Sequence, residues 1–577
     1  MFTDDLNARM EAAAGDGAAD LVMLNVTVAD VFSHEWMKAD VAIKNGEFVG
    51  FNRMKSDRVV NGEGMYMIPS FIDSHVHIES SMVAPPEFAK VVLPHGVTTV
   101  IADPHEIANV AGGKGIQFML DQSENLPLDV RIMLPSSVPA VSFEENGAVL
   151  AAEDLKAFTD HPRVLGLAEI MDYPSLVHRE KQMLDKLALA RGHNMPIDGH
   201  LAGLSHEMID LYRTSGVRTD HEVTTAEEAI ARISRGMYVQ IRQGSVARNL
   251  PAVIKAVTLK NSRRFIFCTD DKHLDELQEE GSIDHLVRLS IQSGIEPLTV
   301  FQMASLNAAE CYGLSKKGAI APGYEADFIL TDDVENLQVR AVYRLGKEIA
   351  ADGKITAKDW PVQTKMEEEL LNTVKMDRFS KKNLNLEIQP ERNVPIIRII
   401  PNELVTIMDM EKTNSQNRIF IPDTGLDHLK LVCADRYRAD GKTGTGIVKG
   451  FRLKRGAIAA SISHDSHNIM ALGTNDDAIY EAIVRLQEMN GGMAVADEDG
   501  SILASLPLPV GGLMSCRRYE EVIENMAQVH KALQQIGFKE AFNPFVMMSF
   551  LALPVIPEIK LTVNGLFQVN EFKWISY

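Results

Sequence analysis

The sequence predicts an α/β protein built around a TIM-like (β/α)8 barrel. Eight short apolar segments recur between residues 67 and 315, and amphipathic patterns such as "SLVHREKQMLDKLALARGH" and "TAEEAIARISRG" separate most of them. Eight strand–helix units over about 250 residues are typical of such a barrel. The chain has 577 residues, too many for one core, so we expect further domains. A doubly wound open sheet is the main alternative.

The apolar segments place the eight barrel strands. Each is short, and most are rich in β-branched or aromatic residues, as strands buried between helices are. The expected strands are residues 67–73, 97–102, 130–134, 164–168, 196–198, 218–220, 238–241 and 265–268. We therefore assign residues 67–315 to the barrel.

A small β-sandwich domain is expected to flank the barrel, built from two separate pieces of chain. "LVMLNVTVADVF" and "DVAIKNGEFVGF" predict short strands, with the hairpin signal Asn45-Gly46 inside the second. A similar pattern returns in "GAIAPGYEADFILTDD" and "VRAVYRLGKEIAADG". The sequence permits the two pieces, residues 1–66 and 316–355, to pair into one domain.

The last third of the chain predicts a separate C-terminal α/β domain over residues 401–577. There "AIYEAIVRLQEMNGG" predicts an amphipathic helix that stops at two glycines, and "GSILASLPLPVGGLMS" predicts a strand that enters a Pro/Gly turn. Residues 356–400 are charged and irregular, and we expect a helix and a linker there.

Composition argues against several classes of function. The formal net charge is -21, so phosphate backbones would be repelled on average, and we expect no nucleic-acid partner. The four cysteines form no CxxC pair, which argues against a cysteine zinc site and a disulfide scaffold. The stretch "MFTDDLNARMEAAAGDGAADLV" lacks the apolar region of a signal peptide, and no membrane span is visible. We expect a cytoplasmic protein without a membrane partner.

Imidazoles and carboxylates follow the expected strands. In "PSFIDSHVHIESSM", two histidines one residue apart point to the same side of a strand. Strand ends in a barrel face one shared mouth, so side chains at several ends would meet there. The six candidates for a metal site are His75, His77, Glu169, His200, His221 and Asp270. They suit one or two divalent cations such as Zn²⁺, Mn²⁺ or Fe²⁺, with Glu169 as the bridging ligand and Asp270 also holding the proton of a bound water.

Other polar residues are candidates for substrate binding or for support of the ligands. "ADPHEIAN" follows the second strand, although it also suits a helix N-terminus, and "IRQGS" follows the seventh, where it could simply shape a loop. "SISHDSHN" lies far beyond the barrel and predicts a lid, a further metal site or a polar turn. These candidates are Glu79, Asp103, His105, Glu106, Arg242, Ser245, His464, Asp465 and His467.

The strand-end pattern resembles that of the amidohydrolase superfamily. Longer stretches are similar to its bacterial adenine deaminases: "PSFIDSHVHIESSM", "LPHGVTTVIADPHEIANVAG", "RQGSVARNL", "CTDDKHLDELQEEGSIDH" and "SISHDSHNIMALGTND". The resemblance covers nearly the whole chain. Strand four offers Glu169 and no lysine, so the carbamylated-lysine bridge of hydantoinase-like members is not available.

The resemblance implies hydrolytic deamination of adenine to hypoxanthine and ammonia by a metal-activated hydroxide. It implies two divalent metal ions, Mn²⁺ first, then Fe²⁺, with Zn²⁺ as a further choice, on the six residues named above. Asp270 would move a proton from water to the leaving amine, and Glu169 would protonate N1 of the ring, with Glu79 or Glu106 as alternatives. The expected partners are a small-molecule purine and further copies of the chain, in a homo-oligomer that is a dimer or larger.

Two rival functions stay open at this point. A cyclic-amide hydrolase of the dihydroorotase or hydantoinase type would share the barrel but would want lysine on strand four. A metal-free scaffold homologue would be expected to lose ligands, whereas this chain retains every candidate. The stretches "HEVTTAEE" and "MASLNAA" depart from the family and leave the preferred purine open.

Overall fold

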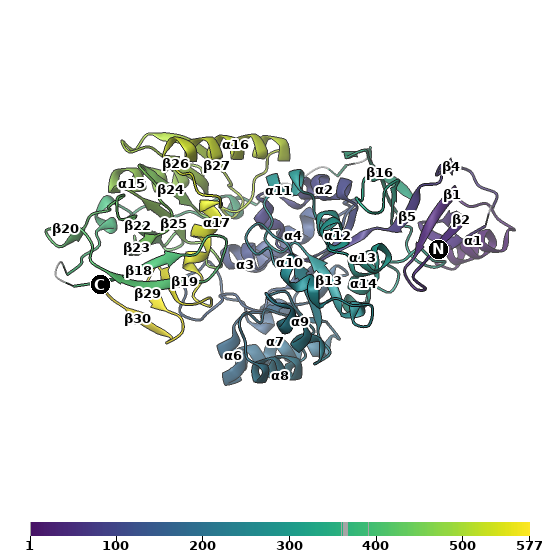
Figure 1. Ribbon diagram of the computed structural model, residues 1–577, viewed down its shortest axis with the longest axis horizontal. Coiled ribbons are helices and arrows are strands. Elements are labelled where there is room, and N and C mark those ends of the chain that lie inside the picture. Colours follow the sequence, from purple (N-terminus) through teal and green to yellow (C-terminus); the bar gives the residue numbers. More distant parts are fainter. Residues whose placement is uncertain (1, 53, 359, 362–366, 390–391) are drawn as a thin grey trace.

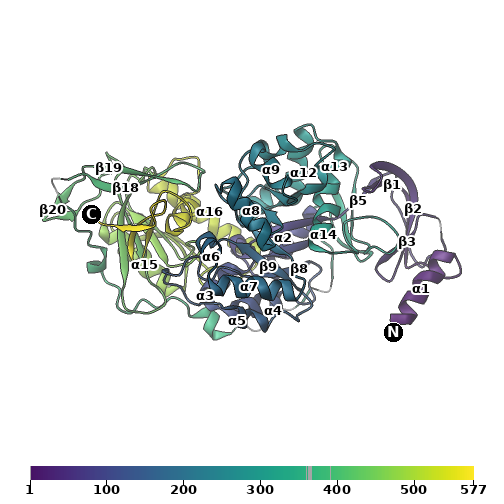
Figure 2. The ribbon, with the colours of Figure 1, turned by 90° about the horizontal axis from the view of Figure 1, so that it is seen from below.

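The computed structural model describes residues 2–577 except 53, 359, 362–366 and 390–391. Figure 1 shows three parts in a row: a sheet containing the N-terminal strands at one end, the barrel in the middle, and the C-terminal region at the other end. The view from below in Figure 2 keeps the same order. The barrel therefore lies between the sheet that contains the N-terminal strands and the C-terminal region of the same chain.

The barrel strands form two parallel sheets. The order in the first is β10-β9-β8-β7-β6, and in the second β11-β12-β13. Their bounds are β6 (Phe71–Val76), β7 (Val97–Ala102), β8 (Asp129–Leu134), β9 (Val164–Ile170), β10 (Ile197–Gly199), β11 (Thr219–Asp220), β12 (Tyr238–Arg242) and β13 (Phe265–Cys268). Except for β6, these agree closely with the strands expected from the apolar segments.

Backbone hydrogen bonds join the two sheets on both sides. The Arg218 N–H donates to the Ile197 carbonyl at 2.8 Å, which links the strands β10 and β11. Val76 and Asp270 form a parallel bridge, which links β6 to the segment after β13. The sheets thus curl into a ring, and the predicted TIM-like barrel is confirmed over the doubly wound alternative.

Helices cover the outside of the barrel (Figures 1 and 2). Their bounds are α2 (Pro85–Val92), α3 (His105–Ala111), α4 (Gly113–Gln122), α5 (Ala152–Lys156), α6 (Tyr173–His178), α7 (Lys181–Gly192), α8 (His206–Ser215), α9 (Ala226–Ile233), α10 (Leu250–Val253), α11 (Leu274–Glu279), α12 (Ile283–Gln292), α13 (Pro297–Ala304) and α14 (Leu306–Tyr312). The single helical pattern near residue 180 is two helices, because Arg179 takes the left-handed conformation that ends α6.

The first expected strand, residues 67–73, divides between two sheets. Its first part belongs to β5 (Tyr66–Pro69), which pairs with β14 (Phe328–Thr331) outside the barrel. The Ser70 N–H donates to the Asp327 carbonyl at 3.2 Å, whereas the Phe71 N–H donates at 2.9 Å to the carbonyl of Gly96, the residue just before β7. The chain changes sheets at Ser70, so the barrel strand begins at Phe71.

The β5–β14 pairing joins the N-terminal strands to those that return after the barrel. The nine-stranded sheet has the order β17-β16-β15-β14-β5-β1-β2-β3, with β4 beside β1. It curls over itself, because the Phe48 ring in β3 lies 6.0 Å from the Phe328 ring in β14. The remaining bounds are β1 (Leu21–Asp30), β2 (Glu35–Lys44), β3 (Glu47–Gly50), β4 (Val59–Asn61), β15 (Val339–Arg344), β16 (Lys347–Ala351) and β17 (Lys354–Ile355), with helix α1 (Phe2–Ala14) before them.

The C-terminal region is built on a mostly antiparallel sheet with the order β19-β18-β23-β22-β25-β24-β26-β27. Helix α15 (Asp476–Glu488) packs Ile479 and Ile483 onto one face, against small side chains such as Ala459. The strands are β18 (Val394–Ile399), β19 (Thr406–Glu411), β22 (Leu429–Ala434), β23 (Thr443–Lys449), β24 (Ala457–Ala460), β25 (Ile469–Gly473), β26 (Gly492–Ala496) and β27 (Ile502–Pro507). The helix and the strand predicted there from sequence are α15 and β27.

Shorter elements complete this region. They are β20 (Ser415–Gln416), β21 (Ile419–Phe420), β28 (Ile559–Thr562), β29 (Gly565–Gln568), β30 (Lys573–Ile575), α16 (Tyr519–Gln535) and α17 (Pro544–Ser549). Within the described residues, no helix has the length and apolar composition that crossing a membrane requires.

The segment 356–400 differs from the expectation of a helix. Its described residues contain only two 3-10 turns, η5 (Glu368–Leu371) and η6 (Lys381–Leu384), before β18. β18 already pairs with β19 and β23, so the C-terminal sheet begins ahead of residue 401. In the first turn, Leu370 is buried and its carbonyl accepts the Gly511 N–H at 2.7 Å, so tertiary contacts hold this segment.

Candidate metal centre and the cavity around it

Three donor atoms converge where β6 and the segment after β13 meet. The Nε2 atoms of His75 and His77 lie 3.1 Å apart, and the Asp270 Oδ1 lies 3.4 Å from the first and 3.1 Å from the second. The backbone brings them together, because the Asp270 N–H donates to the His75 carbonyl at 3.0 Å. Facing ring nitrogens can share at most one proton, whereas a common cation would satisfy both lone pairs.

Glu169 connects this trio to a third histidine. Its Oε2 lies 3.1 Å from the His221 Nε2, and its Oε1 lies 3.7 Å from the His77 Nε2. The His221 ring also stacks on His75, with centroids 4.2 Å apart. A carboxylate with one oxygen toward each group of histidines has the arrangement that a bridging ligand requires.

His200 is placed beside the cluster and not in its centre. It follows β10, and its ring lies 5.5 Å from the His221 ring, centroid to centroid. Its Nε2 is 3.5 Å from the Glu222 Oε1. All six side chains predicted from the strand ends therefore meet at one end of the barrel.

The electrostatics suit a cation. Burial alone would raise the pKa of Asp270, but Arg242 and His75 hold that pKa well below its usual value. Burial also opposes charge on His221, yet Glu169 raises its pKa to about 9. Burial and the nearby His221 lower the pKa of His75. Burial likewise opposes charge on His77, yet the carboxylates raise its pKa, so they draw positive charge to this site. A bound cation would take the place of the protons on His77 and His221, and the imidazole nitrogens and carboxylate oxygens would then form a donor set that fits Mn²⁺, Fe²⁺ or Zn²⁺.

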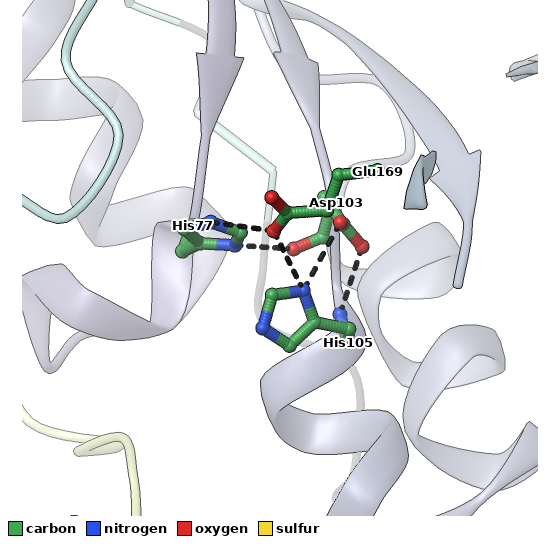
Figure 3. Close-up of side chains that lie close together, drawn as sticks. All are labelled: His77, Asp103, His105 and Glu169. Atoms are coloured by element: carbon green, nitrogen blue, oxygen red, sulfur yellow. Dashed lines mark hydrogen bonds and ion pairs between the residues drawn. The ribbon is translucent and has the colours of Figure 1, made fainter. Parts of the chain in front are cut away.

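Asp103 and His105 approach the same cluster from the end of β7. The His105 Nδ1 lies 3.0 Å from the Asp103 Oδ2 and 3.4 Å from the Glu169 Oε1. The His77 Nδ1 lies 3.0 Å from the Asp103 backbone carbonyl. Figure 3 shows His105 directed at Glu169 and His77 beside them. The possible ligand atoms of these four residues lie within 4.8 Å of one another, so the residues after β7 extend the polar cluster.

The C-terminal region reaches this end of the barrel through the loop 461–468, between β24 and β25. The Glu106 Oε1 lies 2.7 Å from the His464 Nδ1, and the Glu106 Oε2 contacts the His467 Nε2. Asp465 sits between these histidines in the chain, with its Oδ1 4.0 Å from the His105 Nε2. The three residues of the "SISHDSHN" motif therefore lie against the barrel site.

Glu222 is a charged residue of the site that the sequence analysis missed. It follows His221 directly, and its Oε1 contacts the Arg242 Nη1 and lies 3.6 Å from the His221 Nε2. The same Arg242 nitrogen lies 2.8 Å from the Asp270 Oδ2. Its position immediately after a strand-end histidine was the only signal available. Arg242 itself, a predicted candidate, is in direct contact with the cluster.

Two predicted residues lie apart from the centre. Ser245 Oγ donates to the Glu276 Oε2 at 2.5 Å and accepts the His273 N–H at 2.9 Å, so it ties a loop together. Glu79 accepts the Ile107 N–H at 3.1 Å. Burial raises the pKa of Glu79 to about 7. Neither residue lines the central cavity.

The cavity beside the cluster has an apolar wall from the C-terminal region. Leu404, Phe550, Leu553 and Ile556 line it together with the His, Asp and Glu side chains of the barrel. A larger groove opens next to it between the barrel loops and the C-terminal region, and the two share lining residues such as Glu222 and Leu404. These apolar residues carry no chemical signature, so a sequence pattern does not distinguish them from core residues.

Comparison with known proteins assigns the family. Residues 66–355 match the amidohydrolase family, and residues 403–573 match the adenine deaminase C-terminal domain. The chain is 52% identical to the adenine deaminase of Geobacillus kaustophilus over 570 residues, covering 99% of this chain and 98% of that relative. The chain belongs to the adenine deaminase family. Its identity to the Bacillus subtilis adenine deaminase is 50% over 577 residues, covering 100% of both chains.

Among solved structures, the chain is similar to an adenosine deaminase from Xanthomonas campestris with bound zinc. The sequence identity is 16% and the TM-score 0.44, over 59% of this chain and 95% of the other. The sequence-based resemblance to amidohydrolases and to their adenine deaminases is thereby confirmed at the level of the family, through the curated relatives and the two matched domains.

Proposed function

We propose that this member of the adenine deaminase family hydrolyses adenine to hypoxanthine and ammonia at the end of its barrel, with two divalent cations. The observation that carries the proposal is the convergence of His75 Nε2, His77 Nε2 and Asp270 Oδ1, each within 3.4 Å of the others. The relatives that are half identical over the full chain support adenine as the substrate.

Each cation has a set of ligands in the proposal. His75, His77 and Asp270 would hold one, His200 and His221 the other, and Glu169 would bridge them. Bound there, the cations would supply Lewis-acid activation of water at neutral pH. Mn²⁺ is the proposed metal, with Fe²⁺ and Zn²⁺ as the alternatives that the same nitrogen and oxygen donors accept.

Asp270 is the proposed proton carrier. It would take a proton from the attacking water and deliver it to the amine that leaves C6. Arg242 holds the Oδ2 of this carboxylate at 2.8 Å, so Oδ1 is the oxygen that faces His75 and His77. The ion pair orients the carboxylate, and a fixed orientation is what proton transfer at a defined atom requires.

The ring of adenine also needs an acid, because N1 must accept a proton as water adds to C6. The candidates for this role from the sequence are Glu169, Glu79 and Glu106. Both oxygens of Glu169 face imidazoles, and despite burial the histidines hold its pKa well below its usual value. Glu106 is engaged by His464 and His467, and Glu79 does not line the cavity. Glu169 thus suits the bridging role better than the acid role.

A substrate panel with Mn²⁺ present tests the function. We expect ammonia release from adenine and no ring opening of dihydroorotate or hydantoin, with activity lost after chelation and restored by Mn²⁺. Ring opening without ammonia release would favour the cyclic-amide hydrolase. A purified protein that binds no metal and turns over neither substrate would favour the scaffold.

Two expectations from the sequence remain predictions. The chain is proposed to form a homo-oligomer, a dimer or larger, and to work in the cytoplasm. Size-exclusion chromatography with light scattering measures the first, and cell fractionation the second.

A further inference from the structure

Asp465 has a buried carboxyl group to which the proposed mechanism assigns no role. It belongs to the loop 461–468 and is only 2% exposed, yet it lines the cavity that holds His77, His221 and Asp270. Its Oδ2 is buried and has no hydrogen-bond partner among the described residues. A buried polar atom without a partner is costly, so such an oxygen indicates a ligand that is yet to bind.

Contacts with the rest of the molecule anchor the loop on both sides of Asp465. Glu106 of the barrel contacts His464 and His467 through its two different oxygens. The His464 ring also stacks on Phe550, with centroids 4.3 Å apart and planes 14° from parallel. These contacts fix the position of Asp465 at the cavity. A precise contact with a substrate requires such a fixed position.

The chemistry of a protonated carboxyl matches one edge of the purine. Such a group offers one O–H donor and one carbonyl acceptor side by side. Adenine presents an acceptor at N1 and a donor at its exocyclic amine on its Watson–Crick edge, and enzymes that act on bases read that edge. We propose that Asp465 contacts this edge, donating its proton to N1 and accepting an N–H of the amine. This inference rests on the proposed deamination of adenine.

The proton balance closes over one turnover. As the water oxygen bonds to C6, the π pair of C6=N1 moves to N1 and takes the proton of Asp465, so an O–H bond breaks and an N–H bond forms. Asp270 passes the first proton of water to the amine, which leaves as ammonia. The second proton of water is lost as C6=O forms and goes to solvent, from which Asp465 regains one. N1–H remains in hypoxanthine.

The charges around Asp465 are compatible with a proton donor. Burial raises its pKa, His105 opposes this, and Glu106 adds to it, with a result of about 6. Carboxyls in buried sites beside other carboxylates commonly serve as acids for this reason. Glu169, by contrast, has a pKa well below its usual value because the neighbouring histidines outweigh its burial.

Two substitutions separate a substrate contact from a structural role. Asp465→Asn keeps one donor and one acceptor but cannot give up a proton, so we expect kcat to fall about 100-fold and KM to stay within about threefold. Asp465→Ala removes both contacts, so KM should rise about tenfold as well. 1-Deazaadenine, used as a competing ligand, lacks the N1 acceptor, so its Ki should change less than the KM of adenine between wild type and Asp465→Ala.

Control measurements distinguish a substrate contact of Asp465 from a role as metal ligand and from a failure of the proposed deamination. Asp499→Asn, at an exposed position of the same region, should match wild type. Unchanged kcat in Asp465→Asn, or the same KM and kcat in both Asp465 variants, would overturn the contact. Loss of one metal equivalent in Asp465→Asn would overturn it in favour of a metal ligand, because His105, Glu106 and Asp465 also lie within 4.8 Å of one another. A wild type that releases no ammonia from adenine would refute both proposals.

Discussion

The two halves of the site are assembled in different ways. In the barrel half, every ligand candidate lies in or just after a strand, and the backbone ladder places it, as the Val76–Asp270 bridge does for His75 and His77. In the C-terminal half, His464 and His467 are held by Glu106, which lies 358 and 361 residues away in the chain. In the proposed mechanism, water activation thus depends on sheet geometry, whereas the proposed substrate contact depends on side-chain contacts between two parts of the molecule.

The largest effect is expected in the barrel half. Asp270→Asn removes the proposed proton carrier, which is also a proposed metal ligand, so ammonia release should fall by about 10³-fold or more. Initial rates with adenine and Mn²⁺ measure this, and Asp210→Asn on the exposed face of α8 serves as the control. Full turnover in the Asp270 variant would remove this residue from the mechanism.

A smaller effect is expected where the halves meet. Glu106→Gln replaces the carboxylate that contacts both His464 and His467, so the loop 461–468 should loosen. We expect about 10- to 100-fold lower kcat/KM and about 3 kcal/mol lower stability, while the metal content stays at the wild-type level. Metal analysis and urea unfolding of this variant and of the exposed control Glu227→Gln test the comparison. Loss of metal from Glu106→Gln would mean that metal binding in the barrel depends on the contact with the loop 461–468.

Lys560 supports the apolar wall of the C-terminal half. Its Nζ donates to the backbone carbonyls of Leu404 at 2.9 Å and Phe550 at 3.0 Å, and both residues line the cavity. Burial lowers the pKa of Lys560 to about 7. Lys560→Met leaves both carbonyls without this donor, so we expect the KM for adenine to rise a few-fold.

The same lysine makes stability depend on pH. An unfolded lysine titrates near about 10.4, so above pH 7 the folded protein binds fewer protons than the unfolded chain. Its contribution to stability therefore rises with pH, by on the order of 2 kcal/mol between pH 7 and 9. Between pH 7 and 9 the unfolding free energy of wild type should therefore rise relative to that of Lys560→Met by about this amount, whereas the exposed control Lys573→Met should stay parallel to wild type. Parallel curves for all three would contradict the assignment.

The smallest effect is expected at Ser245. Its hydroxyl bonds to Glu276 and to the His273 backbone, outside the central cavity. Ser245→Ala should change kcat/KM by less than about threefold and stability by about 1 kcal/mol. A rise in KM of tenfold or more would instead support the substrate contact that the sequence suggested.

Much of the barrel half could be predicted because strand geometry is regular. Alternate residues of a strand share a side, so the spacing of His75 and His77 was enough to pair them. Parallel strands end at one face of a barrel, so Glu169 and His221 could be expected to meet despite their separation. The first strand was placed too early because apolar residues such as Met67 and Ile68 fit a strand of either sheet. The change of sheet at Ser70 depends on β14, a partner strand far along the chain.

The sequence by itself determined the fold class, the family resemblance and the residue types that surround the barrel end. Only the tertiary structure decided that Glu106 meets His464 and His467, that Glu222 joins the cluster through Arg242, and that Leu404 and Phe550 close the cavity. The physical reason is that backbone hydrogen bonds repeat with a fixed period, which a sequence pattern reports. Contacts between side chains of separate domains have no period, because they depend on how two complete surfaces pack.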